Sequence, residues 1–426
     1  MSFSDLRFVV ASDVLLACFL PLAILILSYK HFPSFALSDI RDLFAFSPRN
    51  RRRHGHFSLE RAYYSFSQYA RLSANELSRM RSSYATLSRT NRNIGYKIGY
   101  TKKLDHLRDV TSLNTVVVDG IVELALEEFP FLKDEPVINT DFADLGRVRE
   151  SLKHFVRDWS EEGATERARI FTPIINLLSE VDAGQRGQMK VLVPGCGLGR
   201  LAWEISQLGF DTTANELSFF MTLSLRFLLS TKATTSVNDH QLRPYAHWFS
   251  HQRSNVSLFR CISFPDVVPR RSANFCLVEG DFLDIKIPTT GTKAKPLGWT
   301  KDHANAPGTQ PEGFDYIVTL FFIDTSLDVL TTINHIYTLL RPGGTWINLG
   351  PLLWTGGAQA KVELSLDEVL NAAKDIGFIL ASEDNGPASR QTVECEYTGD
   401  KNAMMRWIYK AEFWVGRKPE HRPSGI

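Results

Sequence analysis

Cysteine is scarce in this chain, and the five cysteines form no recognisable pattern. They stand at Cys18, Cys196, Cys261, Cys276 and Cys395. No Cys-x-x-Cys pair occurs, and a scattered, odd-numbered set predicts neither a zinc cage nor a disulfide framework. We therefore expect no metal centre, and a reducing compartment such as the cytoplasm.

An excess of charge of either sign is also missing, and so is any internal repeat. Lysine and arginine total 48 against 47 aspartates and glutamates, so the formal net charge is +1. A nearly neutral chain offers no electrostatic reason to expect nucleic acid as a partner. With 426 residues, of which 44% are hydrophobic, the chain is expected to form two or more globular units.

One long apolar run stands near the N-terminus, at residues 8–28. It is long enough to cross a bilayer as a helix, although its core at 14–27 could also be a signal-peptide segment or a buried helix. Basic residues at 30–53 follow it, and by the positive-inside rule they favour a cytoplasmic location for what comes next. The sequence predicts a candidate membrane anchor before a cytoplasmic catalytic domain. A segment packed on the protein, or an extension foreign to it, stays an alternative.

Composition and periodicity divide the chain into five parts. We expect a candidate anchor at 1–33, a basic linker at 34–56, a helical region at 57–178, a catalytic domain at 179–418 and a tail at 419–426. Apolar residues recur every three or four positions from 59 to 72, which is typical of an amphipathic helix. Further helices are expected at 114–128, 145–159 and 165–181, and a polar surface loop at 288–313. The many arginines and lysines of the helical region could face an acidic partner, but a solvated helix face is the favoured interpretation.

The segment 191–200 is the most informative in the chain. Three apolar residues that read as a strand are followed by Gly195, Gly197 and Gly199, and then by a helical pattern at 201–206. Strand, glycine turn and helix form the first half of a nucleotide-binding unit, in which a β-carbon would keep a ligand off the backbone. The spacing Gly-x-Gly-x-Gly suits S-adenosylmethionine, which has a ribose and no phosphate. An ordinary packing turn is the alternative.

Acidic residues follow the next two predicted strands. Glu216 comes about twenty residues after the turn, where a carboxylate can bind both ribose hydroxyls. Asp281 and Phe282 end a third strand, where an acid can bind the adenine amino group and an aromatic ring can stack on the base. Segments 314–322 and 341–349 read as a fourth and a fifth strand. Together they predict an α/β fold, a Rossmann-like class I methyltransferase sheet with an α-helical N-terminal region.

Several motifs in order resemble the carnosine N-methyltransferase family. They lie at residues 155–163, 193–204, 215–221, 264–267, 280–282, 321–325 and 346–353. The resemblance runs from about residue 57 to residue 418 and leaves out the apolar N-terminus. It implies an enzyme that uses S-adenosylmethionine to methylate the imidazole of carnosine, a small histidine dipeptide, which gives anserine.

The resemblance also implies roles for individual residues. Asp324 would face the substrate imidazole, where a carboxylate can fix the tautomer, stabilise the imidazolium and accept its proton; the alternative is an N-cap for a helix starting near Ser326. Arg157 would bind the carboxylate of the cofactor, unless it forms a salt bridge at a helix end. Tyr397 and Tyr409 would line the substrate pocket, although aromatic side chains more often pack in a core.

His154 and Leu320 complete the cofactor contacts that the resemblance implies. Three positions depart from the family pattern: Thr355 stands where animal members have a substrate-contacting histidine, Trp407 where a tyrosine is common, and His154 where glutamine is usual. The substrate carboxylate would then be held differently, with Thr355 as the candidate contact. Methylation of another histidine peptide or of a protein histidine stays an alternative, as does a non-catalytic binding protein. The sequence leaves open whether the chain forms homo-oligomers.

Overall fold

The computed structural model describes residues 55–134, 143–287, 313–381 and 386–420. The contacts separate residues 1–56 from the compact unit Phe57–Ile426, and only the latter is described below. The candidate anchor, almost all of the basic linker and the polar loop lie outside the described residues. Within those residues, no helix combines the length and the apolar character needed to cross a bilayer.

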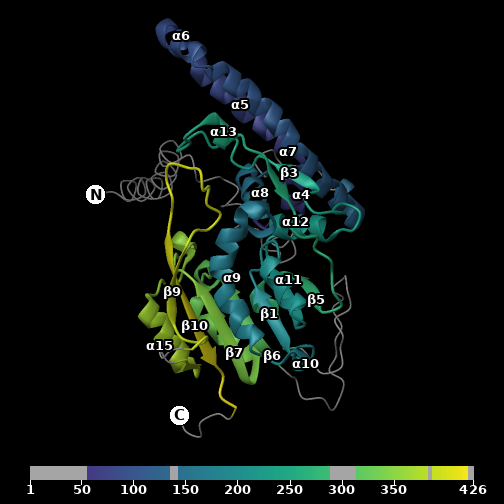
Figure 1. Ribbon diagram of the computed structural model, residues 1–426, viewed down its shortest axis with the longest axis vertical. Helices are drawn as coiled ribbons and strands as arrows, with labels where there is room; N and C mark the ends of the chain where they lie inside the picture. Colours follow the sequence, from purple (N-terminus) through teal and green to yellow (C-terminus); the bar gives the residue numbers. More distant parts are fainter. Residues whose placement is uncertain (1–54, 135–142, 288–312, 382–385, 421–426) are drawn as a thin grey trace, which may run out of the picture. The chain divides into compact units, whose positions relative to one another are not determined.

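An eight-stranded sheet forms the centre of the unit (Figure 1). Its strands are β1 (Lys190–Pro194), β2 (Asp211–Glu216), β5 (Phe275–Glu279), β6 (Phe314–Leu320), β7 (Leu340–Gly350), β8 (Ile379–Leu380), β9 (Gln391–Cys395) and β10 (Tyr409–Arg417). Along the order β5-β2-β1-β6-β7 all neighbours are parallel. β10 then runs antiparallel to β7, β8 and β9. The five predicted strands are confirmed, and they are the five parallel ones.

Helices cover both faces of the sheet. They are α9 (Ala164–Ser179), α10 (Ala183–Arg186), α11 (Arg200–Gln207), α12 (Phe219–Leu229), α14 (Val329–Leu339) and α15 (Leu366–Ile376). Val191 and Val193 of β1 pack with α9 and α11, whereas Leu192 packs with α14 and α15 on the opposite face. Successive strand residues point to opposite faces, so a strand buried on both sides has to be apolar throughout.

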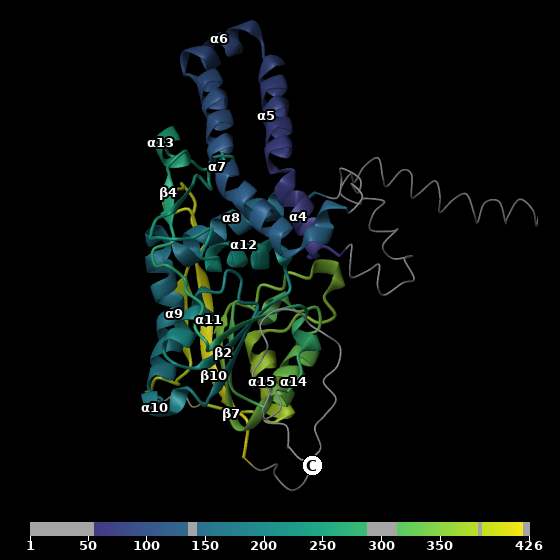
Figure 2. The ribbon, with the colours of Figure 1, turned by 90° about the vertical axis from the view of Figure 1, so that its right-hand side faces the viewer.

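A helical region precedes the sheet in sequence and packs on α12. Its helices are α4 (Leu59–Ser67), α5 (Tyr69–Ala85), α6 (Arg89–Lys97), α7 (Tyr100–Glu128) and α8 (Leu145–Trp159). Phe66, Ile121, Phe155 and Phe220 share one core and thereby join α4, α7, α8 and α12. α5 and α7 run side by side, with α6 at the end of the pair (Figure 2).

Four helices were predicted between residues 59 and 181, where the described part of the chain has six, α4 to α9. The helix at 145–159 is confirmed as α8, and that at 165–181 corresponds to α9. The single helix expected from 59 to 72 is wrong, because Gln68 separates α4 from α5. The helix expected at 114–128 is only the C-terminal half of α7.

Short elements complete the chain. They are η1 (Pro130–Lys133), η3 (Glu161–Gly163), β3 (His240–Leu242), α13 (Asn255–Leu258), β4 (Ile262–Phe264), η4 (Phe282–Asp284), η5 (Ile323–Thr325) and η6 (Gly357–Gln359). Three of them matter for the site: η4 follows β5, η5 follows β6, and η3 joins α8 to α9. The carboxyl ends of the parallel strands, where such folds bind ligands, therefore carry η4, η5 and the glycine turn after β1.

Candidate functional site

The glycine turn follows β1, and its three glycines meet different surroundings. Gly195, Gly197 and Gly199 have φ of 62°, 57° and 72°, a left-handed region that L side chains rarely adopt. A β-carbon on Gly195 would lie 2.5 Å from the Phe322 ring, and one on Gly199 would lie 2.9 Å from Leu225. A β-carbon on Gly197 would have no neighbour nearer than 3.8 Å. Gly195 and Gly199 therefore allow close packing, whereas Gly197 borders open space.

Glu216 ends β2 directly beside this turn. Its side chain accepts hydrogen bonds from the backbone N–H of Gly197 at 2.9 Å and of Ser218 at 2.8 Å. The residue is 9% exposed, and burial raises the pKa of its carboxyl group. A carboxylate has about four acceptor positions, and the backbone N–H groups around Glu216 do not occupy all of them.

Asp281 and Phe282 follow β5, as the sequence predicts, but their surroundings differ. Asp281 is exposed, and its Oδ1 caps η4 by accepting from the Leu283 N–H at 2.9 Å. Phe282 is buried, with ring centroids 5.4 Å from Phe322 and 4.9 Å from His335. The ring expected to stack on adenine is thus also part of the core around η4. Leu320, half-buried at the end of β6, packs against the core on the other face.

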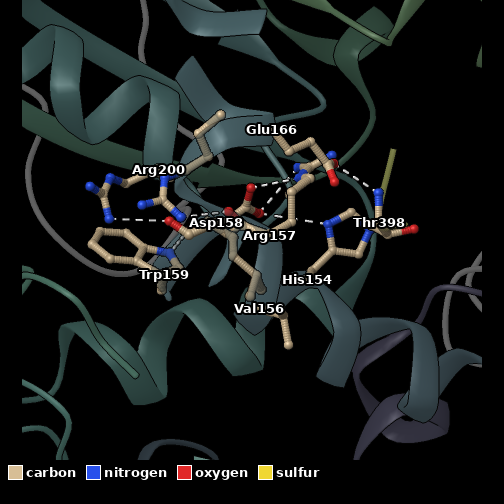
Figure 3. A network of polar contacts seen from close by, with 12 residues as sticks. His154, Val156, Arg157, Asp158, Trp159, Glu166, Arg200 and Thr398 are labelled. Carbon is tan, nitrogen blue, oxygen red and sulfur yellow. Dashed lines mark hydrogen bonds and ion pairs between the residues drawn. The ribbon is translucent and has the colours of Figure 1, made fainter. Parts of the chain in front are cut away.

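The last two turns of α8 carry three polar side chains, His154, Arg157 and Asp158 (Figure 3). All three lie within 4.0 Å of a β-carbon built on Gly197. Arg157 donates to both carboxylate oxygens of Asp158, from Nε at 2.7 Å and from Nη2 at 3.1 Å. Burial alone would raise the pKa of Asp158, but the Arg157 charge outweighs it and holds that pKa well below its usual range. The helix-end salt bridge considered for Arg157 therefore exists. The Arg157 guanidinium is nevertheless also the atom group nearest to a β-carbon built on Gly197, at 3.8 Å.

His154 lies one turn earlier on α8, with Nδ1 3.6 Å from Asp158 Oδ2. That separation is too long for a hydrogen bond, and Nδ1 is buried without a hydrogen-bond partner within the described part of the chain. Burial and the neighbouring Arg157 lower the pKa of the imidazole, so the ring is neutral. A buried ring nitrogen without a partner at this place is available to a polar ligand.

An aromatic wall continues from Arg157 towards the end of β6. The guanidinium carbon of Arg157 lies 4.5 Å from the ring centroid of Tyr397, and the ring of Phe321 stacks on that of Tyr397 with centroids 4.7 Å apart. Tyr409 meets Phe321 edge-on at 5.7 Å. The structure thus brings the two predicted pocket tyrosines together around Phe321. Sequence reasoning gave Phe321 no role, although it lies in the motif 321–325 directly after the fourth strand.

Phe321 has a φ of +50°, which is unusual for a bulky residue. Its N–H donates to the Leu349 carbonyl at 2.9 Å, and a β-carbon on Gly350 would lie 3.1 Å from the Phe321 backbone. The end of β7 therefore holds the backbone of Phe321 in place. Strained residues of this kind cluster at ligand sites.

Asp324 lies in η5, three residues after Phe321, and is 5% exposed. Its Oδ2 accepts from the Leu353 N–H at 3.1 Å, and burial raises the pKa of its carboxyl group to about 6. The helix cap considered for Asp324 is wrong: α14 begins at Val329, and Asp328 caps it by accepting from the Thr331 N–H at 3.1 Å. Within the described residues, no cation forms an ion pair with Asp324.

Thr355 belongs to the segment that Asp324 holds. Its N–H donates to the Asp324 carbonyl at 3.1 Å, and its side chain is exposed. The structure therefore places Thr355 beside the predicted imidazole-binding residue. Trp407, the other departure from the family pattern, is 71% exposed. Across the described ranges, no group of three or more His, Cys, Asp or Glu side chains is arranged to hold a metal ion.

Comparison with known proteins identifies the family. The model of the family described as carnosine N-methyltransferase matches residues 134–420. The mouse (Mus musculus) carnosine N-methyltransferase is 34% identical over 328 residues, which are 75% of this chain and 74% of the mouse protein. Its counterpart in Schizosaccharomyces pombe is 32% identical over 340 residues, 75% of this chain and 83% of the yeast protein.

Among solved structures, similarity is found to the Haemonchus contortus phosphoethanolamine N-methyltransferase 2 in complex with S-adenosyl-L-methionine. That similarity has 14% identity and a TM-score of 0.35, over 68% of this chain and 59% of the other. The residues that the family model matches include the glycine turn and the strands that follow it. The chain therefore belongs to the carnosine N-methyltransferase family.

Proposed function

We propose that this chain transfers a methyl group from S-adenosylmethionine to an imidazole nitrogen of carnosine, which gives anserine. The observation that carries the proposal is Asp324, a buried carboxylate three residues after Phe321 of the aromatic wall, in a chain of this family. Histidine dipeptides offer a flat ring with one N–H and one unprotonated nitrogen. An aromatic wall fits the ring, and a carboxylate fits its N–H.

The cofactor would be held by the residues around the glycine turn. The positive charge of Arg157 suits the carboxylate of the methionine part, and His154 Nδ1 is free for a polar contact beside it. Glu216 suits the ribose, and the exposed Asp281 suits the adenine amino group. When bound, the cofactor supplies a methyl group activated by the positive charge on its sulfur.

Asp324 would accept a hydrogen bond from one imidazole N–H, so that the other nitrogen keeps its lone pair for the methyl carbon. A new N–C bond forms, and the electron pair of the broken S–C bond stays on sulfur. The positive charge passes to the imidazole, where the carboxylate of Asp324 stabilises it and can take up the ring proton. Correct placement of the ring supplies much of the acceleration.

A specific observation favours a second candidate substrate, a histidine within a longer peptide or a protein. Four apolar side chains just before Tyr409 in the sequence are exposed. They are Met404, Met405, Trp407 and Ile408, with exposed fractions of 64%, 45%, 71% and 51%. Exposed apolar side chains mark a binding region when they form a contiguous surface. Leu353, which donates to Asp324, is 56% exposed. Apolar residues next to the target histidine could pack there.

Labelled S-adenosylmethionine and a panel of histidine peptides test both candidates. Carnosine should be labelled, and mass spectra with proton NMR should place the methyl group on the ring nitrogen nearer the side-chain methylene. Methylation of the other ring nitrogen or of the amine would contradict the conversion to anserine. Calorimetry with the unlabelled cofactor addresses the remaining alternative, a non-catalytic binding protein, because such a protein could bind the cofactor and label nothing.

A further inference from the structure

The end of α8 carries Arg157 and Asp158, which lie next to Gly197. The last carbonyls of a helix have no partner within the helix. Here these carbonyls accept hydrogen bonds from residues of three other segments: Arg167 of α9, Arg200 at the start of α11, and Asp266 after β4.

Four consecutive carbonyls accept hydrogen bonds from this group. Arg167 Nη1 donates to Arg157 O and to Ser160 O, both at 2.7 Å. Arg200 Nη1 donates to Asp158 O at 3.1 Å, and the Asp266 N–H donates to Trp159 O at 2.8 Å. Cations at a helix C-terminus also stabilise it through the helix dipole.

Asp266 joins the two arginines. Its Oδ1 accepts from Arg200 Nη1 at 2.6 Å and its Oδ2 from Arg167 Nη2. The three side chains are nearly enclosed, with exposed fractions of 12% for Asp266, 7% for Arg167 and 10% for Arg200. Two guanidinium groups repel each other, and the nearly enclosed carboxylate of Asp266 offsets that repulsion. Arg200 also pairs with Glu204, through Nε at 2.7 Å.

Arg200 also connects two parts of the candidate site. It follows Gly199 directly, so it belongs to the glycine turn. Figure 3 shows Arg200 and Trp159 on one side of Asp158, with Arg157 and His154 on the other. The guanidinium carbon of Arg200 lies 4.8 Å from the Trp159 ring centroid. One side chain therefore ties the backbone of the turn to the helix end that presents Arg157.

We propose that Asp266, Arg167 and Arg200 form a positioning clamp that sets Arg157 against the glycine turn and thereby determines affinity for the methyl donor. The clamp touches neither the reacting atoms nor the cofactor; it acts through Arg157. The proposal rests on the proposed function, since it assumes that S-adenosylmethionine binds at this turn.

Asp266→Asn tests the clamp, because it keeps the volume but removes the charge between the two arginines. We expect the dissociation constant for S-adenosylmethionine to rise at least about tenfold, as for the loss of one charged hydrogen-bonded contact. At saturating cofactor, kcat and the KM for carnosine should change less than threefold. Asp315→Asn is the matched control. Asp315 is 11% exposed, pairs with Arg341 and accepts from the Lys190 N–H, but it lies at the amino end of β6, so cofactor affinity should not change.

A double-mutant cycle separates this role from a general effect on the fold. In the Arg157→Ala background, Asp266→Asn should weaken cofactor binding less than threefold further, because the residue through which the clamp acts is gone. Equal losses in both backgrounds would overturn the proposal, and so would unchanged affinity in Asp266→Asn with the native melting temperature. Arg200→Lys, which keeps the positive charge but loses the planar guanidinium group, should show the same coupling to Arg157. If both variants fail to fold, the clamp serves the fold and the proposal is wrong. Failure of the unmodified protein to bind the cofactor would instead refute the proposed function.

Discussion

Asp324 is the residue on which the proposed chemistry depends most directly. Burial raises the pKa of its carboxyl group to about 6, yet at neutral pH the group is mostly ionised. Its one observed side-chain hydrogen bond comes from the Leu353 backbone, so acceptor positions stay available. A buried, ionised carboxylate with spare acceptors is suited to a ring that gains positive charge.

We expect Asp324→Asn to lower single-turnover methylation of carnosine about a hundredfold or more, the usual contribution of an acid–base or electrostatic group. Affinity for S-adenosylmethionine should not change, because Asp324 lies on the substrate side. Single-turnover rates at excess cofactor isolate the chemical step from binding. Asp328→Asn, which alters the half-buried cap of α14 four residues later, is the control. A native rate in Asp324→Asn would leave this residue only the task of holding the segment at 353–355.

The raised pKa of Asp324 also predicts that folding stability depends on pH. Between the unfolded value of about 3.8 and the folded value of about 6, the native state holds more protons, so stability falls as pH rises through this window. In Asp324→Asn that loss is absent. The free energy of unfolding of the variant relative to the parent should therefore rise from pH 4 to pH 7, by up to about 3 kcal/mol at about 1.4 kcal/mol per pKa unit. Thermal melts of both proteins across this pH range measure the difference. A constant difference across this range would show that Asp324 titrates normally.

At the scale of elements, the glycine turn combines packing and binding within five residues. The sequence predicted all three glycines as ligand-contacting. The structure separates Gly195 and Gly199, which face Phe322 and Leu225, from Gly197, which faces open space near Arg157. Which glycine packs and which faces open space depends on residues such as Leu225 and Phe322, more than twenty positions further along the chain. The local Gly-x-Gly-x-Gly pattern therefore could not predict it.

Gly197→Ala should weaken binding of S-adenosylmethionine at least about tenfold, since a methyl group would stand where the ligand approaches the backbone. Its cost in stability should be that of a left-handed alanine, about 1–2 kcal/mol. Gly209→Ala is a control with φ +105° and no neighbour nearer than 3.8 Å, and it should leave cofactor affinity unchanged. Isothermal titration and thermal melts measure the two effects. Equal affinities for both variants would remove Gly197 from the binding site.

The strands could be predicted better than the helices, for a physical reason. A parallel strand buried on both faces needs a continuous apolar run, as at Val191–Val193, and such runs stand out. The first half of α7 buries only a narrow stripe, Leu104, Leu107 and Val110, within a charged sequence, and was therefore missed. The pattern at 59–72 keeps its period across Gln68, so the break between α4 and α5 left no signal.

The residues of the candidate site could likewise be predicted only where a local pattern marks them. Glu216, Asp281 and Asp324 could be found because each follows a predicted strand, and strand ends meet at one edge of a parallel sheet. The stack of Arg157, Tyr397 and Phe321 joins parts of the chain more than seventy residues apart, and only the resemblance to the family suggested two of its members. Asp266 and Arg200 lie within the motifs at 264–267 and 193–204, but no role could be assigned to them from the sequence, because their contact joins distant parts of the chain.

At the scale of the whole unit, ion pairs join the helical region to the sheet around the candidate site. Arg226 of α12 pairs with Glu279 at the end of β5 and with Glu128 at the end of α7. Glu166 of α9 accepts from the Thr398 N–H at 2.8 Å and so holds the segment that carries Tyr397. The helical region therefore takes part in forming the site, and removing it should abolish cofactor binding along with the fold.

The N-terminal apolar run lies outside the residues that the structure describes. The unit Phe57–Ile426 has its own cores, and the family match begins at residue 134. We therefore expect a chain that lacks residues 1–29 to fold, with the melting temperature and single-turnover rate of the full-length protein. Sedimentation with lipid vesicles then compares the two proteins: an anchor predicts that only the full-length chain sediments. A truncated chain that aggregates without lipid, or that melts at a clearly lower temperature, would mean that residues 1–29 pack against the folded unit, and the anchor interpretation would be wrong.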